Sequence, residues 1–221
     1  EPGDDKTFSG WESWADAIIF QGHAMELFAS LRSSSKHLIV DIYDPMHLEQ
    51  LEQARHLPAE QWDTQVADAR NTIESQLALG DYFLCASERQ RHFYLGQLTT
   101  LGRVNPAGYA DDPHLERLIG VVPFGLPGVD PRHSRPVLKG VVPGIEEDDQ
   151  VIIWSGGVYD WFDPLTLIRA VAQLRITRPS VKLFFMGTAH PHPGVPEMPI
   201  IKASRDLAQE LGVAGKHVFF N

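Results

Sequence analysis

The sequence has very little cysteine and no long hydrophobic segment. Its single cysteine, Cys85, lies in the apolar run 82–86, so an intramolecular disulfide is impossible and we expect a buried structural thiol. No apolar run approaches the ~18 residues of a membrane-spanning helix, and the acidic start does not resemble a signal peptide. We therefore expect a cytoplasmic protein without a transmembrane segment. Because the sequence lacks an initiator Met and stops directly after an expected strand at 217–220, we also expect it to be a piece of a longer protein.

Basic residues are scarce as well. The chain has 19 Lys and Arg against 29 Asp and Glu, which gives a formal net charge of −10. Such a protein repels nucleic-acid backbones and anionic lipid surfaces, so we expect no nucleic-acid partner. Hydrophobic residues make up 43% of the 221 residues, which is enough for a globular core and excludes global disorder.

Common catalytic signatures are also missing. The sequence has neither a G-x-S-x-G elbow nor a Cys with a plausible His partner, which argues against the usual nucleophilic hydrolases. No G-x-G-x-x-G follows any expected strand, so an oxidoreductase that binds a dinucleotide is a weak hypothesis.

One stretch, 151–186, organises the expected fold. The apolar run 151–154 predicts a strand buried on both faces, which stops at a glycine turn, Ser155-Gly156-Gly157. Asp163 and Pro164 can start a helix, and the apolar run 181–186 predicts a second buried strand. Strands joined through a helix are parallel, and ligands of such sheets bind at the carboxyl ends of the strands. We therefore expect the chemistry in the loops 155–163 and 187–198.

The rest of the sequence continues this alternation and predicts an α/β fold. Further strands are expected at 17–20, 37–43, 82–86 and 120–125, and helices at 25–31, 59–79, 87–101, 113–119 and 200–211. Gly80 is expected to end the second of these helices, and Ser87 with Gln90 forms a capping box for the third. The Pro-, Gly- and acid-rich segment after Gly125 reads as a linker. We therefore predict two domains, 1–143, with a linker from about 126, and 144–221.

The loop after the strand 151–154 holds the first candidate residues. Gly156 and Gly157 would let a phosphate approach the backbone, although two glycines can also serve only to turn the chain. Trp161 is one of three aromatic residues in this loop that could pack against a sugar or base; the others are Tyr159 and Phe162. Asp163 is most simply a helix cap, and Asp160 is either a turn residue or an acceptor for a hydroxyl group.

The second expected loop begins with Gly187 and Thr188, which directly follow a strand and could contact a nucleotide. His190 and His192 have a spacing that could suit a metal, but no Cys or carboxylate stands at ligand spacing nearby, so we expect no metal site.

A polar cluster follows the expected strand 37–43. Tyr43 and Asp44 are the candidate catalytic residues, with Asp41 and His47 close in sequence. The structural alternative is that Asp44-Pro45 simply ends a strand or starts a helix, and that Asp41 is a buried hydrogen-bond acceptor.

Three segments together resemble the family 4 type (group 1) glycosyltransferases of the GT-B fold. They are ALGDYFLCASERQRHFYL (78–95), with Ser87-Glu88 at the family's Ser-Glu position, GVVPFGLP (120–127), and the stretch 151–187. The likeness covers roughly residues 37–220. It implies two Rossmann-like parallel-sheet domains, both incomplete in this chain.

The resemblance also implies a function, namely transfer of a sugar from a nucleoside diphosphate sugar to a hydroxyl acceptor, with retention and without a metal or other cofactor. Gly156, Gly157, Asp160, Trp161, Gly187 and Thr188 would then bind the donor, and Tyr43 and Asp44 would face the acceptor. Val158 and Phe162-Asp163 stand where the family commonly has Arg and Lys, and the family's paired glutamates would lie beyond Asn221. We therefore expect this piece alone to be inactive. The alternative is a non-catalytic α/β module, or a degenerate transferase, that binds a nucleotide or sugar.

Overall fold

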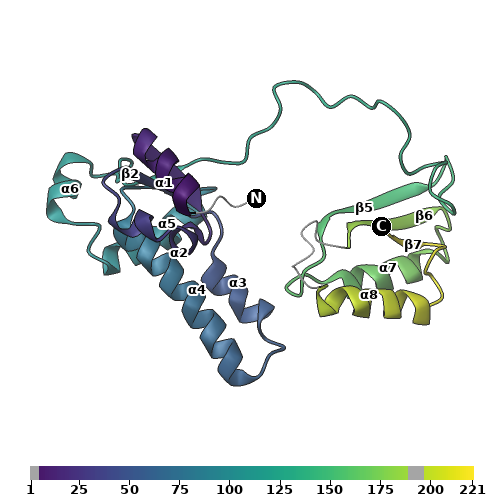
Figure 1. Cartoon of the computed structure of the whole chain (residues 1–221). Helices are drawn as coiled ribbons and strands as arrows, with labels where there is room; N and C mark the ends of the chain where they lie inside the picture. The colour runs from purple at the N-terminus through teal and green to yellow at the C-terminus, as the bar shows by residue number, and fades with distance from the viewer. Residues whose placement is uncertain (1–4, 189–196) are drawn as a thin grey trace. The chain divides into compact units, whose positions relative to one another are not determined.

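The chain forms two compact units, Glu1–Gly128 and Val129–Asn221, in a computed structural model that describes residues 5–188 and 197–221 (Figure 1). Residues 122–149, all of them described, contain no helix or strand. No helix in the described ranges is long and apolar enough to cross a membrane.

The first unit is built on a four-stranded parallel sheet in the order β1-β2-β3-β4. Its strands are β1 (Ala17–Gln21), β2 (His37–Asp41), β3 (Tyr82–Cys85) and β4 (Ile119–Val121). Its helices are α1 (Asp5–Trp14), α2 (Ala24–Leu27), the 3-10 helix η1 (Ala29–Ser33), α3 (Met46–Gln53), α4 (Ala59–Leu79), α5 (Glu88–Thr100) and α6 (Pro106–Asp111). Apolar side chains of β2, β3, α4 and α5 form the main core, in which Cys85 is the buried thiol that the sequence predicts.

The second unit is a three-stranded parallel sheet in the order β5-β6-β7, made of β5 (Gln150–Gly157), β6 (Val181–Gly187) and β7 (Val218–Phe220). Helices α7 (Pro164–Leu174) and α8 (Pro199–Glu210) lie together on one face (Figure 1). Residues of the preceding segment, including Leu138, Val142 and Ile145, pack on the other face. The two units together confirm the α/β fold with parallel strands.

Several expected elements are wrong in detail. β5 is an edge strand, its residues Ile152 and Ile153 are exposed, and Ser155–Gly157 belong to the strand instead of forming a turn after it. The expected helix 113–119 does not form; α6 forms earlier because the Asn105 side chain caps it at the backbone N–H of Gly108 (3.0 Å). The expected helix 25–31 is split into α2 and η1 at Phe28, whose backbone is not helical.

Gly80 directly follows the last residue of α4, as expected. The reason why this residue is a glycine, however, differs from the expected one. Its φ of −64° lies outside the left-handed region, so conformational freedom is not what the position requires. A Cβ atom there would lie 2.7 Å from Val40 Cγ2 and 2.8 Å from Phe83 Cε1, both on fully buried side chains. Glycine is needed because α4 ends directly against β2 and β3.

We expect Gly80→Ala to lower the free energy of unfolding by about 1–3 kcal/mol, because the added methyl group overpacks a core that cannot move aside. Urea denaturation followed by circular dichroism measures the change. Gly96→Ala is the matched control, since a Cβ atom at Gly96 in α5 meets nothing within 4 Å. That variant should gain up to ~1 kcal/mol from helix propensity, and equal effects of the two substitutions would contradict the packing argument.

Candidate functional site

The carboxyl ends of β2 and β3 are joined by the side chain of Gln90 at the start of α5. Its Nε2 donates to the carbonyl of Tyr43 (2.7 Å), and its Oε1 accepts the backbone N–H of Ala86 (2.8 Å). The Ser87 hydroxyl accepts the Gln90 N–H (3.3 Å), as the capping box predicts, but the Gln90 side chain reaches back to Ala86 and not to Ser87. Gln90 therefore fixes the segment that carries Tyr43 and Asp44.

Tyr43 and Asp44 lie between the end of β2 and the start of α3. The backbone N–H of Tyr43 donates to Asp41 Oδ1 (3.3 Å), so Asp41 is a hydrogen-bond acceptor as the structural alternative predicts, but it is only partly buried. The Tyr43 ring meets Phe124 edge to face, with centroids 5.6 Å apart. Burial, followed by the charges of Asp44 and Asp41, raises the pKa of the Tyr43 hydroxyl, so Tyr43 is a neutral hydrogen-bonding group near pH 7.

Asp44 has two close titratable neighbours on α3. Burial, followed by the charge of Asp44, raises the pKa of Glu49. Burial lowers the pKa of His47, although the charge of Asp44 acts in the opposite direction. The His47 ring stacks on the Phe93 ring, with ring centroids 5.8 Å apart. The result is an acidic site with a neutral histidine beside it.

Three polar atoms around this site are buried without a protein partner among the described residues. They are Asp44 Oδ1, His47 Nδ1 and the hydroxyl oxygen of Tyr94 on α5. Tyr94 is fully buried, and burial together with the Asp44 charge raises the pKa of its hydroxyl. Buried polar groups normally find partners, so this is the position in the first unit best suited to a polar ligand.

A pocket of about 230 Å³ begins at His47 and runs between α4 and α5. Its wall includes the apolar side chains of Ile73, Leu77 and Leu101. Across the described ranges, no group of three His, Cys, Asp or Glu side chains could hold a metal ion. His190 and His192, the residues weighed as metal ligands, lie outside the described residues.

In the second unit, glycines bring the carboxyl ends of β5 and β6 very close together. Gly157 pairs with Gly187, and a Cβ atom on Gly187 would lie 2.9 Å from the carbonyl oxygen of Gly156. A Cβ atom on Gly157 would meet the Tyr159 ring at 2.7 Å, whereas one on Gly156 would meet nothing within 4 Å. Gly156 is also exposed, so it is the glycine whose backbone an outside group can approach.

The aromatic residues after β5 pack mainly on one another. Trp161 stacks on Tyr159, with ring centroids 4.7 Å apart and planes 4° from parallel, so one face of each ring is covered. Phe162 is 43% exposed, while Val158 is buried in the core beneath α7 and α8. Val158, where the resembled family has Arg, is therefore a core residue.

The two aspartates of this loop both bond to helix starts. Asp163 Oδ1 accepts the backbone N–H of Thr166 (3.0 Å) in α7, which confirms the cap and lowers the pKa of Asp163. Asp160 Oδ1 accepts the N–H of Ile200 (3.0 Å) in the first turn of α8. Asp160 is a turn residue, as one of its two alternatives predicts, because the Phe162 N–H donates to the Tyr159 carbonyl (2.9 Å) and closes a turn around it; its carboxylate in addition bonds to a helix 40 residues away.

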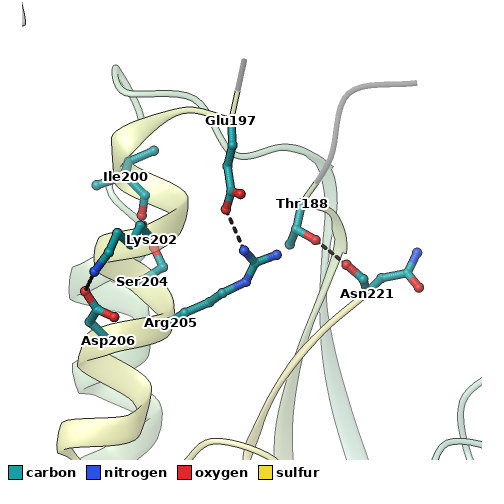
Figure 2. Close-up of polar contacts among 8 residues, drawn as sticks. All are labelled: Thr188, Glu197, Ile200, Lys202, Ser204, Arg205, Asp206 and Asn221. Carbon is teal, nitrogen blue, oxygen red and sulfur yellow. Dashed lines mark hydrogen bonds and ion pairs between the residues drawn. The ribbon is translucent and has the colours of Figure 1, made fainter. Parts of the chain in front are cut away.

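Thr188 and Arg205 both make polar contacts with neighbouring residues at the same end of the sheet (Figure 2). The buried Thr188 hydroxyl donates to the Asn221 carbonyl. Arg205 Nη1 pairs with Glu197 Oε1 at 2.5 Å, and its guanidinium carbon lies 5.9 Å from the centre of the Phe220 ring. Arg205 is a cation beside the strand ends that sequence reasoning missed, since nothing in the sequence of α8 distinguishes it from an ordinary surface residue.

Comparisons with known proteins add no assignment. No protein-family model matches the chain, and no curated protein matches it.

Proposed function

We propose that the chain is part of a glycosyltransferase that transfers a sugar from a nucleoside diphosphate sugar to a hydroxyl acceptor, with retention and without a metal. The observation that carries the proposal is Gly156, an exposed glycine with free space around it at the carboxyl end of a parallel strand that leads into a helix. The sequence resemblance to GT-B transferases supports the same assignment. We also propose a cytoplasmic location.

In this proposal the second unit binds the donor. The backbone at Gly156 and Gly157 approaches the diphosphate, and Gly187 keeps β6 close enough to complete the site. Trp161, which is partly exposed, packs against the nucleotide or sugar, while Asp160 and Thr188 hold the loop and the sheet end in place through their own hydrogen bonds. Arg205 supplies positive charge for the leaving diphosphate by exchanging Glu197 for a phosphate oxygen.

The acceptor is assigned to the first unit. Asp44 Oδ1 is a buried acceptor without a protein partner in the described part of the chain, so it suits the hydroxyl group of an acceptor. Tyr43 lines the same position with a neutral phenol. Hydroxyl recognition by a carboxylate and an aromatic ring fits a glycan, a lipid with a polar head or a small molecule.

A second candidate is a non-catalytic module that binds a nucleotide or a sugar. It is favoured by Val158, because the resembled family commonly has an arginine at this position and a buried valine supplies no positive charge. The two candidates differ in whether sugar transfer follows binding.

Gly156→Val tests donor binding. Because a Cβ atom at Gly156 meets no protein atom within 4 Å, the variant should fold normally yet block the approach of a phosphate group. We expect calorimetric titration of the chain with nucleoside diphosphates and their sugars to show at least a tenfold lower affinity, about 1.4 kcal/mol.

Gly128→Val is the matched control, since Gly128 is equally open but lies outside both candidate sites. Unchanged affinity of Gly156→Val, or no binding of any nucleoside diphosphate or nucleotide sugar to the unsubstituted chain, would contradict the proposed donor site. Sugar transfer to an acceptor hydroxyl would rule out the second candidate.

A further inference from the structure

The pocket of about 230 Å³ in the first unit borders the hydrophobic core. Ile73 and Leu77 of α4, which line it, are only 2% and 1% exposed, and Leu101, which packs against the same core, directly follows α5. Positions 73 and 77 are about one helical turn apart, so both side chains lie on the same face of α4. A molecule that enters the pocket therefore meets an apolar wall.

The volume of the pocket suits a small organic molecule. A cavity of about 150 Å³ lined by Leu, Ile and Phe side chains can hold benzene. With about 230 Å³, this pocket has room for a ring of that size together with a polar substituent. Binding of such a ring removes apolar surface of both the ligand and the wall from water, which is favourable.

The charges at the pocket favour a neutral ligand. Arg70 and Glu74, both exposed on α4, contribute one positive and one negative side chain to its lining. Gln97 and Thr100 of α5 add uncharged polar groups. Because the two charges balance and water screens both of them, the pocket offers no net attraction to a carboxylate or an ammonium group.

A buried polar atom marks the end of the pocket at α3. His47 lines the pocket, and its Nδ1 is buried without a protein partner in the ranges that the structure describes. The His47 ring lies 15° from parallel to the Phe93 ring, a contact that restricts the orientation of the imidazole. Buried polar atoms normally have a partner, so this nitrogen indicates a ligand with a hydrogen-bonding group. A hydroxyl group suits either tautomer, because it can both donate and accept.

We propose that this pocket binds a small neutral molecule that consists of an apolar ring and one hydroxyl group. The ring lies against Ile73, Leu77 and Leu101, and the hydroxyl group forms a hydrogen bond with His47 Nδ1. This inference goes beyond the proposed function and does not depend on it, because it requires neither a nucleotide sugar nor sugar transfer.

The test is a methyl NMR titration of the full chain, labelled at Ile and Leu, with phenol and separately with toluene. The two probes have nearly the same size and shape, but only phenol carries a hydroxyl group. We expect both probes to shift the methyl signals of Ile73, Leu77 and Leu101 in a saturable way. No saturable shift of these signals with either probe overturns the inference.

His47→Phe tests the hydrogen bond, since phenylalanine keeps an aromatic ring next to Phe93 but has no ring nitrogen. The quantity to compare is the ratio of the phenol affinity to the toluene affinity, because the two probes differ in how strongly water solvates them. We expect this ratio to fall about tenfold in the variant, as the loss of one hydrogen bond at a buried site allows. An unchanged ratio overturns the assigned role of the hydroxyl group.

Thr100→Trp tests the location and does not require His47→Phe to fold. Thr100 is exposed and lines the pocket, so the larger side chain can occupy the pocket from its solvent side. Thr99→Trp is the matched control, because Thr99 is also exposed on α5 and its hydroxyl also donates to the carbonyl four residues earlier. We expect Thr100→Trp to weaken both probes at least tenfold and Thr99→Trp to weaken them less than twofold. Equal effects of the two substitutions overturn the inference.

Discussion

Phe185→Ala is expected to lower the free energy of unfolding of the second unit by about 3–5 kcal/mol. Phe185 lies in the central strand β6 and is fully buried beneath α7 and α8. Its ring stacks on Phe220 with centroids 5.0 Å apart and lies 5.6 Å from the Trp154 ring. Removing it leaves a cavity between all three strands and both helices, which rigid neighbours can fill only in part.

Urea denaturation combined with hydrogen exchange of peptides from residues 150–187 measures this effect in the unit that carries the change. Phe185→Leu should cost less because it retains more side-chain volume, and Ile176→Ala should cost little because Ile176 is 81% exposed. A loss for Phe185→Ala no larger than that for Ile176→Ala would contradict the assigned core.

Lys182→Met is expected to destabilise the second unit by about 3–5 kcal/mol, because it leaves a buried carboxylate without its cation. Lys182 Nζ lies 3.7 Å from Asp149 Oδ2 and donates to the Lys216 carbonyl at 3.0 Å. The two side chains are only 12% and 7% exposed, and Asp149 also accepts the backbone N–H of Glu146 at 2.7 Å. The pair joins the segment before β5 to the start of β6.

The matched control is Lys202→Met on α8. Lys202 pairs with Asp206 at a shorter distance, 2.6 Å, but these side chains are 78% and 58% exposed. Because water screens an exposed pair, this variant should change stability by only about 0–1 kcal/mol. The same denaturation experiment compares the two, and a larger loss for Lys202→Met would show that distance and not burial decides.

The sequence was most informative where one local pattern determines one element. Apolar runs placed β2, β3 and β6, and strands separated by helices predicted their parallel pairing. Ser87 and Asp163 predicted their helix starts because a side-chain cap bonds to an N–H only three residues away. The candidate residues Asp44 and Gly156 were found because each comes shortly after an apolar run in the sequence.

Contacts between distant segments required the tertiary structure. Arg103 donates to the carbonyls of Leu77, Ala78 and Gly80 at the end of α4, a role that no pattern near Arg103 indicates. The bond from Ile200 to Asp160 likewise joins two separate segments.

By itself the sequence therefore determined which segments form strands, where several helices begin and that the sheets are parallel, because these features depend on neighbouring residues along the chain. Only the tertiary structure decided that β5 is an edge strand, that Gly80 is required by close packing and that one buried oxygen of Asp44 has no partner among the described residues. The physical reason is that burial, packing distance and the balance of nearby charge are properties of the surroundings in space, to which residues far apart in the chain contribute.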